Sequence, residues 1–228
     1  MILASHQPDF MPWMGYFYKI FLSDKFVFSD NVLYSKTGRH DYNDILTGNG
    51  VQRLKMPIHY EVKNLNEIRI AATDKDIRKM TKTIREAYGK AKYFDEVYPV
   101  IEAMINSAQG TILSEFNRRC ITTFCTFFGL STDRTFYKSS DLPLENRRDA
   151  RIIEMCHLLD ADVYISGTGA KDYHIERDYR RNGIRLVYSD YQPVQYEQVK
   201  GRSAINLSVI DYVMNCGFEL PEEWRRLK

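Results

Sequence analysis

A histidine and a glutamine stand where the first apolar segment of the chain ends. The histidine can act as a general base, and the glutamine amide can donate a hydrogen bond to a developing negative charge. His6 and Gln7 follow residues 2–5, and Asp30 closes the second such segment, 25–30. An imidazole accepts a proton near neutral pH, a carboxylate can act as a base, and an amide can stabilise a developing oxyanion. His6, Gln7 and Asp30 are therefore candidate catalytic residues, although an isolated histidine is more often a hydrogen-bonded structural residue.

Three further segments carry side chains suited to holding an anionic or sugar-like substrate. Residues 34–39 supply a hydroxyl and two cations, the turn 165–170 combines glycines with hydroxyls, and residues 173–196 are rich in tyrosine. The candidate binding residues are Tyr34, Lys36, Arg39, Ser166, Gly167, Tyr173 and Tyr196. Taken singly, the residues of 34–39 and of the 165–170 turn more often have a structural role, and the tyrosines are equally consistent with a surface loop, so the hypothesis depends on their grouping. We expect His6, the 165–170 turn and the 187–196 segment to border one pocket.

Several well-defined catalytic and metal-binding motifs do not occur in the chain. The five histidines show no HExxH or His/Cys spacing, so no metal site is predicted. The 165–170 turn lacks the GxxxxGK[ST] pattern of a phosphate loop, and there is no GxSxG or HxGH sequence. We predict no bound cofactor, apart from a nucleotide or an activated amino acid as the donor substrate.

Strands and helices alternate at both ends of the chain, and this pattern predicts how the candidate residues are positioned. Strands are expected at 2–5, 25–30, 133–137, 163–166 and 185–188, with helices at 13–22, 147–159 and 175–182. Such alternation favours a parallel sheet, in which ligands bind at the carboxyl ends of the strands. His6 and Ser166 both stand at such ends.

The middle of the chain has a different pattern. Asn49-Gly50 is a strong hairpin signal between strands expected at 42–46 and 51–57, with a further strand at 67–71. Helices are expected at 76–88, 95–107 and 111–128, with Pro99 favouring a later start for the second, and at 208–216. The predicted fold is α/β: a Rossmann-like, mainly parallel sheet flanked by helices, with a β-rich insertion (34–71) and a helical segment (76–128). All 228 residues are expected to form one domain.

The composition of the chain limits the classes of partner that are expected to bind it. Residues are 44% hydrophobic and 27% charged, and the net charge of +2 argues against nucleic acid as a partner. No apolar run is long enough for a signal peptide or a bilayer span, so a cytoplasmic protein with a small-molecule substrate and no membrane contact is expected. The four cysteines form no CxxC pair and are interpreted as reduced and structural. The oligomeric state is left open.

A long motif near the N-terminus resembles the opening of the WbqC-like protein family. It runs His6-Gln7-Pro8-Asp9-Phe10-Met11-Pro12-Trp13-Met14-Gly15-Tyr16-Phe17, and is followed by Tyr34-Ser35-Lys36, Lys55-Met56-Pro57 and Ile165-Ser166-Gly167 in the order of the family. The resemblance covers almost the whole chain. It adds Asn43 and Lys55 to the candidate binding residues. Tyr42 stands where the family commonly has arginine, which implies either a different donor or acceptor, or substitution by Arg39.

The resemblance implies a role in bacterial surface polysaccharide (O-antigen) biosynthesis, with transfer of a glycyl or other aminoacyl group onto a sugar. We therefore expect a transferase that moves an aminoacyl or acyl group onto a hydroxyl or amine, with His6 as general base and Lys36, Arg39 and Lys55 holding donor phosphate. Three alternatives stay open: a nucleotidyltransferase-like enzyme, a DNA base-modification enzyme gripping DNA through Arg177, Arg180, Arg181 and Arg185, and a non-catalytic sugar- or nucleotide-binding module.

Overall fold

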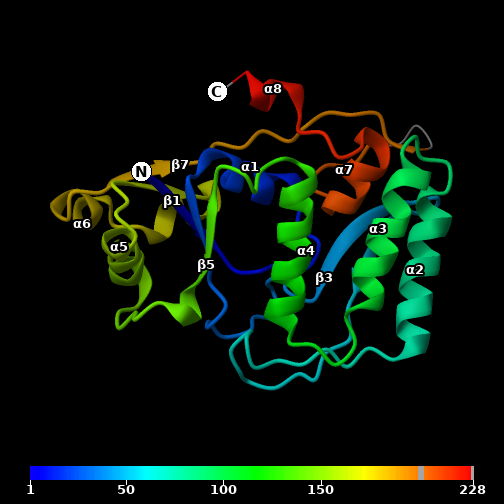
Figure 1. The fold of residues 1–228 in the computed structure, drawn as a ribbon, viewed down its shortest axis with the longest axis horizontal. Coiled ribbons are helices and arrows are strands. Elements are labelled where there is room, and N and C mark those ends of the chain that lie inside the picture. Colours follow the sequence, from blue (N-terminus) through cyan, green and yellow to red (C-terminus); the bar gives the residue numbers. More distant parts are fainter. Residues whose placement is uncertain (200–202, 227–228) are drawn as a thin grey trace.

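A five-stranded parallel sheet forms the centre of the computed structural model, which describes residues 1–199 and 203–226 (Figure 1). Its strands are β1 (Ile2–His6), β2 (Lys25–Phe28), β5 (Thr135–Lys138), β6 (Val163–Ser166) and β7 (Arg185–Tyr188). Their spatial order is β5-β2-β1-β6-β7, and every neighbouring pair is parallel. The predicted α/β fold with a mainly parallel sheet is therefore confirmed.

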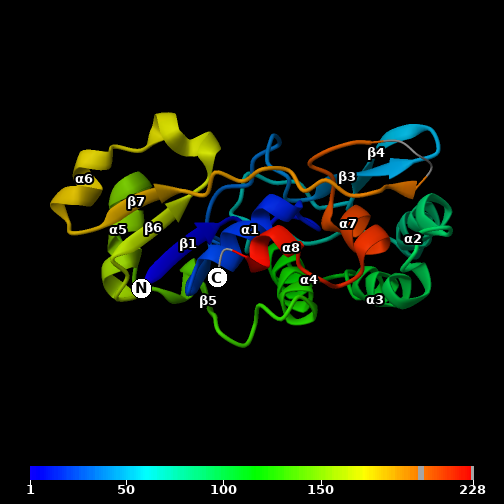
Figure 2. The same ribbon diagram turned by 90° about the horizontal axis from the view of Figure 1, so that it is seen from above.

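Helices cover both faces of the sheet because alternate strand residues point to opposite sides. On one face, Ala4 and Phe26 share a core with α1 (Met14–Leu22). On the other face, Leu3 and Val27 pack with α5 (Arg148–Leu158) and α6 (Glu176–Arg181). Figures 1 and 2 both show α5 and α6 at one end of the molecule. Each fully buried large apolar side chain contributes roughly 1.5–3 kcal/mol relative to exposure.

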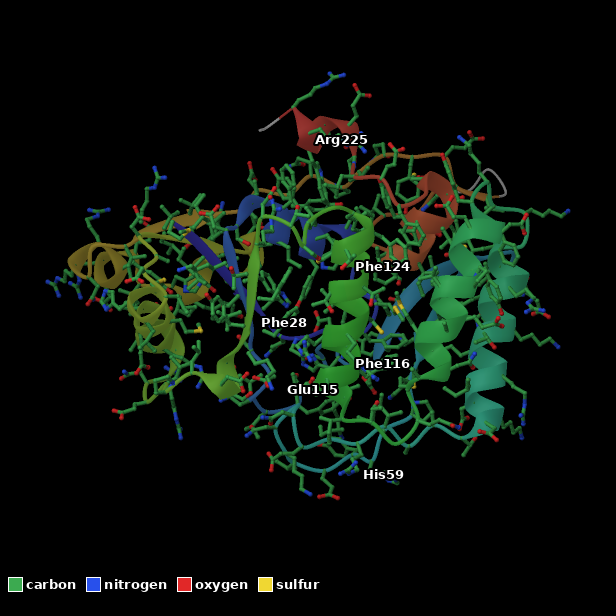
Figure 3. The ribbon with its side chains drawn as sticks, viewed as in Figure 1. Phe28, His59, Glu115, Phe116, Phe124 and Arg225 are labelled. Carbon is green, nitrogen blue, oxygen red and sulfur yellow. The ribbon has the colours of Figure 1, made fainter. Side chains whose placement is uncertain are left out.

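A helical layer and a hairpin form the other end of the molecule (Figure 2). The helices are α2 (Asp74–Tyr88), α3 (Phe94–Asn106), α4 (Leu113–Phe127) and α7 (Val209–Cys216), and the hairpin is β3 (Tyr42–Thr47) with β4 (Gly50–Lys55). A short helix, α8 (Glu222–Arg225), follows α7. Figure 3 marks Phe116 and Phe124 on α4; their rings lie 6.2 Å from Phe10 and 6.0 Å from Phe17. These contacts join the helical layer to the N-terminal motif.

Two local predictions are wrong, and both have a backbone explanation. Residues 67–71 form isolated bridges rather than a strand, because Ile70 donates to the carbonyl of Thr111 while Ala71 donates to that of Pro57. With partners on two different segments, no continuous ladder can form. Helix α3 begins at Phe94, not later, and contains Pro99. Proline lacks the N–H group that would bond the carbonyl of residue 95, but this side of the helix is exposed and water can satisfy it.

The four cysteines carry free thiols, and three of them are buried. Burial raises the pKa of the Cys120 thiol to about 12, so it stays protonated and unreactive at neutral pH. No helix within residues 1–199 and 203–226 has the length and apolar character needed to span a bilayer. The same residues contain no cluster of three or more histidine, cysteine or acidic side chains that could hold a metal ion.

Candidate active site

A pocket of about 670 Å³ opens at the carboxyl ends of β1 and β6. Going along the chain, the sheet grows from β1 to β2 and β5 on one side, and then to β6 and β7 on the other. The chain leaves β1 toward one edge of the sheet and later returns to β6, from which it continues toward the other edge. The gap between the carboxyl ends of β1 and β6 is therefore a topological switch point, which is where open parallel sheets bind ligands. The structure places His6, the turn containing Gly167 and Tyr191 around this one pocket.

The loop 7–13 brings the N-terminal motif to the pocket, and side chains from distant elements hold it in place. Met11 has a φ of 41°, in the left-handed region that a non-glycine residue rarely adopts. Its carbonyl accepts hydrogen bonds from the Asn43 amide at 2.8 Å and the Ser208 hydroxyl at 2.7 Å. The Asn117 amide donates to the carbonyl of Pro8 at 2.8 Å. Two prolines prevent regular structure here, so these side chains satisfy the backbone instead.

His6 lines the pocket with an unprotonated imidazole whose tautomer follows from its neighbours. Nδ1 lies 3.1 Å from the carbonyl oxygen of Gln7, which can only accept, so Nδ1 carries the hydrogen and Nε2 keeps its lone pair. The Tyr16 ring packs edge-on against the imidazole at 4.7 Å. Desolvation, and next the charge of Lys19, lower the pKa of His6 to about 4. The side chain is therefore a neutral proton acceptor at physiological pH.

Lys19 carries a buried amine in the same pocket, and it is not among the residues that the sequence patterns indicated. Its residue is 5% exposed, and Nζ donates to the carbonyl of Ser5 at 2.8 Å. Desolvation by burial lowers the pKa of the amine to about 7, so the charged and neutral forms coexist near neutral pH. The sequence does contain a signal for Lys19, which is the single charged residue in the apolar run 16–21. A lysine among residues that are mostly buried is itself expected to be buried, and buried lysines are rare unless they have a specific partner or role.

Ser166, at the end of β6, is joined to two side chains that the fold brings from other elements. Its Oγ lies 2.8 Å from Nε2 of His174, and Nδ1 of His174 lies 2.7 Å from Oδ1 of Asp149 at the start of α5. Asp149 also accepts from the backbone N–H of Ile175 at 2.8 Å and the hydroxyl of Tyr179 at 3.0 Å. Ser166 and His174 line the pocket, and Ser166 is 4% exposed.

The ionisation state of Asp149 determines the direction of its hydrogen bond with His174. Desolvation raises its pKa, but the hydrogen bonds from Ile175 and then His174 outweigh that effect, so the net pKa is lowered. An ionised carboxylate only accepts, so Nδ1 of His174 donates to it, and in the neutral imidazole Nε2 is then the acceptor for the Ser166 hydroxyl. No local sequence pattern marks Asp149, because it precedes Ser166 by 17 positions, with most of α5 and strand β6 between them.

An aromatic pair forms another part of the pocket. The rings of Trp13 and Tyr191 meet edge to face with centroids 5.1 Å apart, and both residues line the pocket. Gly15 allows the Trp13 ring to lie against α1, since a Cβ atom there would be 2.6 Å from the indole. Flat apolar rings with polar edges suit the stacking of a sugar or a base.

Most of the other candidate binding residues lie outside the lining of this pocket and are engaged elsewhere. Tyr34 stands beside Asp41; burial and then the charge of Asp41 raise the pKa of Tyr34 to about 12. The Lys55 Nζ atom is 3.5 Å from the same carboxylate. Lys36 lies over the Tyr60 ring at 4.6 Å.

Five more candidates also lie apart from the pocket lining. Arg39 donates to the side chain of Asn43 at 2.8 Å, and Asn43 in turn supports the loop 7–13. The Asp30 carboxylate is used by the turn after β5, whose Ser140 N–H donates at 2.9 Å. Tyr173 is 81% exposed. Tyr196 donates its hydroxyl to Asp211 at 2.8 Å.

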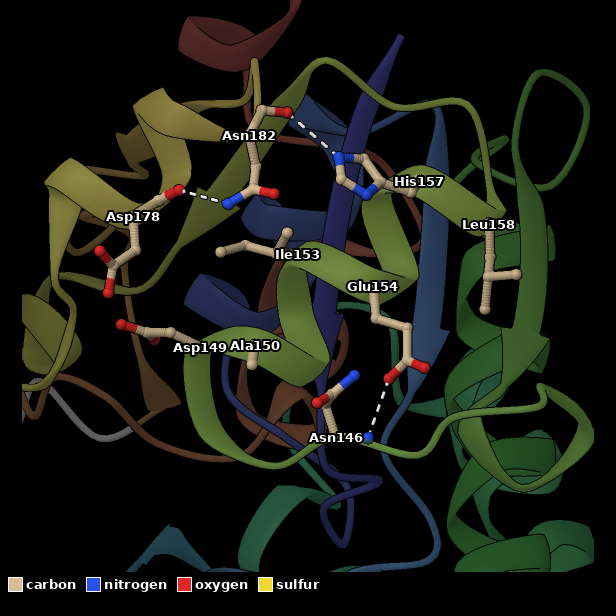
Figure 4. A pocket seen from close by; sticks show the side chains of 9 residues that line it. All are labelled: Asn146, Asp149, Ala150, Ile153, Glu154, His157, Leu158, Asp178 and Asn182. Carbon is tan, nitrogen blue, oxygen red and sulfur yellow. Dashed lines mark hydrogen bonds between the residues drawn. The ribbon is translucent and has the colours of Figure 1, made fainter.

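A second pocket, of about 560 Å³, lies between α5 and α6 (Figure 4). Its polar groups are occupied by local structure. The Glu154 carboxylate accepts the backbone N–H of Asn146, and the side-chain amide of Asn182 donates to the carbonyl of Asp178. Nε2 of His157 donates to the carbonyl of Asn182. The pocket at the strand ends, with its free imidazole and buried amine, is therefore the better candidate for chemistry.

The fold and this pocket define an α/β protein with a ligand-sized site at the switch point of a parallel sheet. The chain belongs to the WbqC-like protein family, whose model matches residues 7–223. It is also 28% identical over 226 residues to the uncharacterized protein Rv1507c of Mycobacterium tuberculosis, covering 98% of this chain and 97% of that protein. No solved structure matches the chain.

Proposed function

We propose that this protein is a transferase that moves an aminoacyl, glycyl-like, or other acyl group onto a hydroxyl or amine of a sugar nucleotide or related acceptor in polysaccharide biosynthesis. The observation that carries the proposal is the state of His6: a neutral imidazole with Nδ1 engaged by Gln7 and with Nε2 free to accept a proton. It lines a pocket of about 670 Å³, large enough for the reacting ends of two substrates.

In the proposed reaction, the acceptor heteroatom attacks the acyl carbon of the donor while its proton passes to Nε2 of His6. The bond between the acyl carbon and the leaving group then breaks, and the proton moves from His6 to the leaving group. Because His6 is a weak base, it accepts the proton late, after the new bond has begun to form. Lys19 supplies positive charge near the developing oxyanion, and the backbone amides of residues 167–169 are further candidate donors, whereas the N–H of Ala170 already donates to the carbonyl of Gly167.

The aromatic pair supports a sugar nucleotide as the acceptor. Trp13 and Tyr191 offer a stacking surface for a sugar ring or a base, while Thr168 offers a hydroxyl group to polar substituents. Lys36, Arg39 and Lys55 are not among the residues that line the pocket, so they are not positioned to hold donor phosphate there.

The test is a transfer assay with glycyl and acetyl thioesters of N-acetylcysteamine as donors and UDP-linked amino sugars as acceptors, with products detected by mass spectrometry. His6→Ala should reduce turnover by about 10²- to 10⁴-fold, the range for loss of a general base. His59→Ala is the matched control, because His59 is an exposed histidine (Figure 3). Equal turnover in His6→Ala and the wild type would exclude His6 as the base, and circular dichroism would show that the variant is folded.

The strand order gives one alternative a specific basis. Numbered in chain order, the sheet runs 3-2-1-4-5, and a pocket at the switch point of such a sheet suits nucleotides as well as acyl donors. A nucleotidyltransferase would release pyrophosphate from a nucleoside triphosphate, whereas acyl transfer from a thioester would not. A coupled pyrophosphate assay with each of the four triphosphates separates the two reactions. Ligand binding in calorimetry with no product in either assay would favour a binding module.

A further inference from the structure

The arrangement of Ser166, His174 and Asp149 resembles the catalytic groups of enzymes that form acyl-serine intermediates. Oγ of Ser166 is 2.8 Å from Nε2 of His174, and Nδ1 of His174 is 2.7 Å from Asp149. These are the distances and the order of contacts that a nucleophile, its base and the group orienting that base require. We infer that Ser166 is a nucleophile that carries the acyl group covalently between donor and acceptor.

The environment of the three residues matches this role. Side-chain exposure is 7% for His174 and 15% for Asp149, so the hydrogen bonds between them are shielded from water. The Tyr179 hydroxyl and the Ile175 N–H hold the carboxylate from two further directions. A purely structural contact between His174 and Asp149 would not require the second imidazole nitrogen to lie 2.8 Å from a serine that lines the pocket at the strand ends.

The turn after Ser166 leaves room for a substrate carbonyl. A Cβ atom built on Gly167 or Gly169 would meet no heavy atom within 4 Å, and both glycines line the pocket. Backbone N–H groups in such a turn can stabilise a tetrahedral oxyanion without bulky side chains in the way. Ser166 and this turn therefore line the same pocket.

Each half of the reaction balances. In the first half, Oγ of Ser166 attacks the acyl carbon of an ester or thioester donor, and its proton passes to Nε2 of His174. The bond to the leaving group breaks, His174 protonates that group, and an acyl ester of Ser166 remains. In the second half, the acceptor hydroxyl or amine attacks this ester and His6 takes its proton. The bond between the acyl carbon and Oγ of Ser166 then breaks, and the same proton passes from His6 to Oγ, so that both imidazoles end neutral. The scheme rests on the proposed function and adds a covalent intermediate to it.

The experiment uses a small alkyl fluorophosphonate, in which a serine oxygen displaces fluoride, and it needs no acceptor substrate. Incubation of the full-length protein should give one adduct in the intact mass, and peptide mapping should locate it on Ser166. Ser166→Ala should abolish the adduct. Ser139→Ala should keep it, because Ser139 is a buried serine after the β5 end whose hydroxyl donates to Asp30 and Asn31 rather than to a histidine.

The positions of His174 and Asp149 are tested by readouts that a structural role would not change. His174→Ala should slow labelling by about 10²- to 10⁴-fold, and imidazole added to the solution should restore part of the rate. Asp149→Asn should slow labelling and change the ¹⁵N shifts of His174 to those of the other tautomer, because an amide can no longer hold Nδ1–H in place.

The outcomes separate this inference from the proposed function. No adduct, an adduct on another residue, or labelling that persists in Ser166→Ala would overturn the inference, and mapping on the wild-type protein decides this even if the variant does not fold. Transfer that continues at the wild-type rate in Ser166→Ala would also overturn it while leaving the transferase intact. Labelling of Ser166 without transfer to any acceptor would support the nucleophile and count against the transferase.

Discussion

The Oδ2 atom of Asp9 lies 3.7 Å from Nδ1 of His6. The other carboxylate oxygen of Asp9 is 2.9 Å from Nδ1 of His40, whose ring is fully buried. One carboxylate therefore stands between two imidazoles, one of which lines the pocket. Its charge raises the pKa of His6 and so opposes desolvation and Lys19, which lower it. Asp9 thus contacts both His6, the candidate base, and the buried His40, and its charge contributes to the pKa of His6.

This relationship predicts how His6 affects stability with pH. The folded pKa of about 4 is below the ordinary value of 6.5, so between these values the unfolded chain binds more protons than the folded protein. The free energy of unfolding should therefore fall as the pH drops from 6.5 through 4. Urea denaturation across this range should show a smaller fall in His6→Gln than in the wild type. Parallel curves for the two proteins would contradict the lowered pKa.

Lys19 should have the corresponding effect on the alkaline side. Its pKa of about 7 lies below the ordinary 10.5, so folding at pH 6 requires a buried charged amine, whereas at pH 10 the folded amine is already neutral. Lys19→Met removes that charge with a side chain of similar length. Its stability relative to the wild type should be more favourable at pH 6 than at pH 10, measured by chemical denaturation. A difference independent of pH would show that Lys19 is not desolvated as described.

Gly38 should be required for the packing of His40. A Cβ atom at this position would lie 2.2 Å from Nε2 of His40, and the ring is buried against Asp9 and cannot move freely. Gly38→Ala should destabilise the protein by about 1–3 kcal/mol, the range for overpacking in a core. Thermal denaturation provides the measurement. Gly169→Ala is the control, since an added methyl group there meets no atom within 4 Å and should cost nothing.

Asn43 should stabilise the loop 7–13 through its donor group rather than by binding substrate. Its amide nitrogen donates to the carbonyls of Phe10 at 3.1 Å and Met11 at 2.8 Å, and the residue is fully buried. Asn43→Asp keeps the shape but replaces the donor with an acceptor, leaving both carbonyls unpaired at a cost of about 1–3 kcal/mol. Asn49→Asp, in the exposed hairpin turn, should have little effect. Equal denaturation midpoints for the two variants would refute this role.

The sheet was predictable because its signals are local. Short apolar runs at 2–5 and 163–166, separated by helical patterns, identify parallel strands with little dependence on their surroundings. The wrong strand at 67–71 failed for a non-local reason: its hydrogen bonds go to two different segments, near 57 and 111. Alternation of residue types cannot report which partner a backbone group will find.

The residues of the candidate site likewise fall into two groups: those that local sequence patterns identified and those that only the folded structure revealed. The chain by itself determined that His6, Gln7, Ser166 and Gly167 stand at strand ends, because the residue types and the strand pattern are read from neighbouring positions. Only the tertiary structure decided that Asp149 reaches His174 and that Lys19 is buried beside His6. It likewise removed Lys36, Arg39 and Lys55 from the pocket lining, because nearer partners hold them. Contacts between side chains depend on how separate elements pack, and that packing is set by the whole core rather than by any one segment.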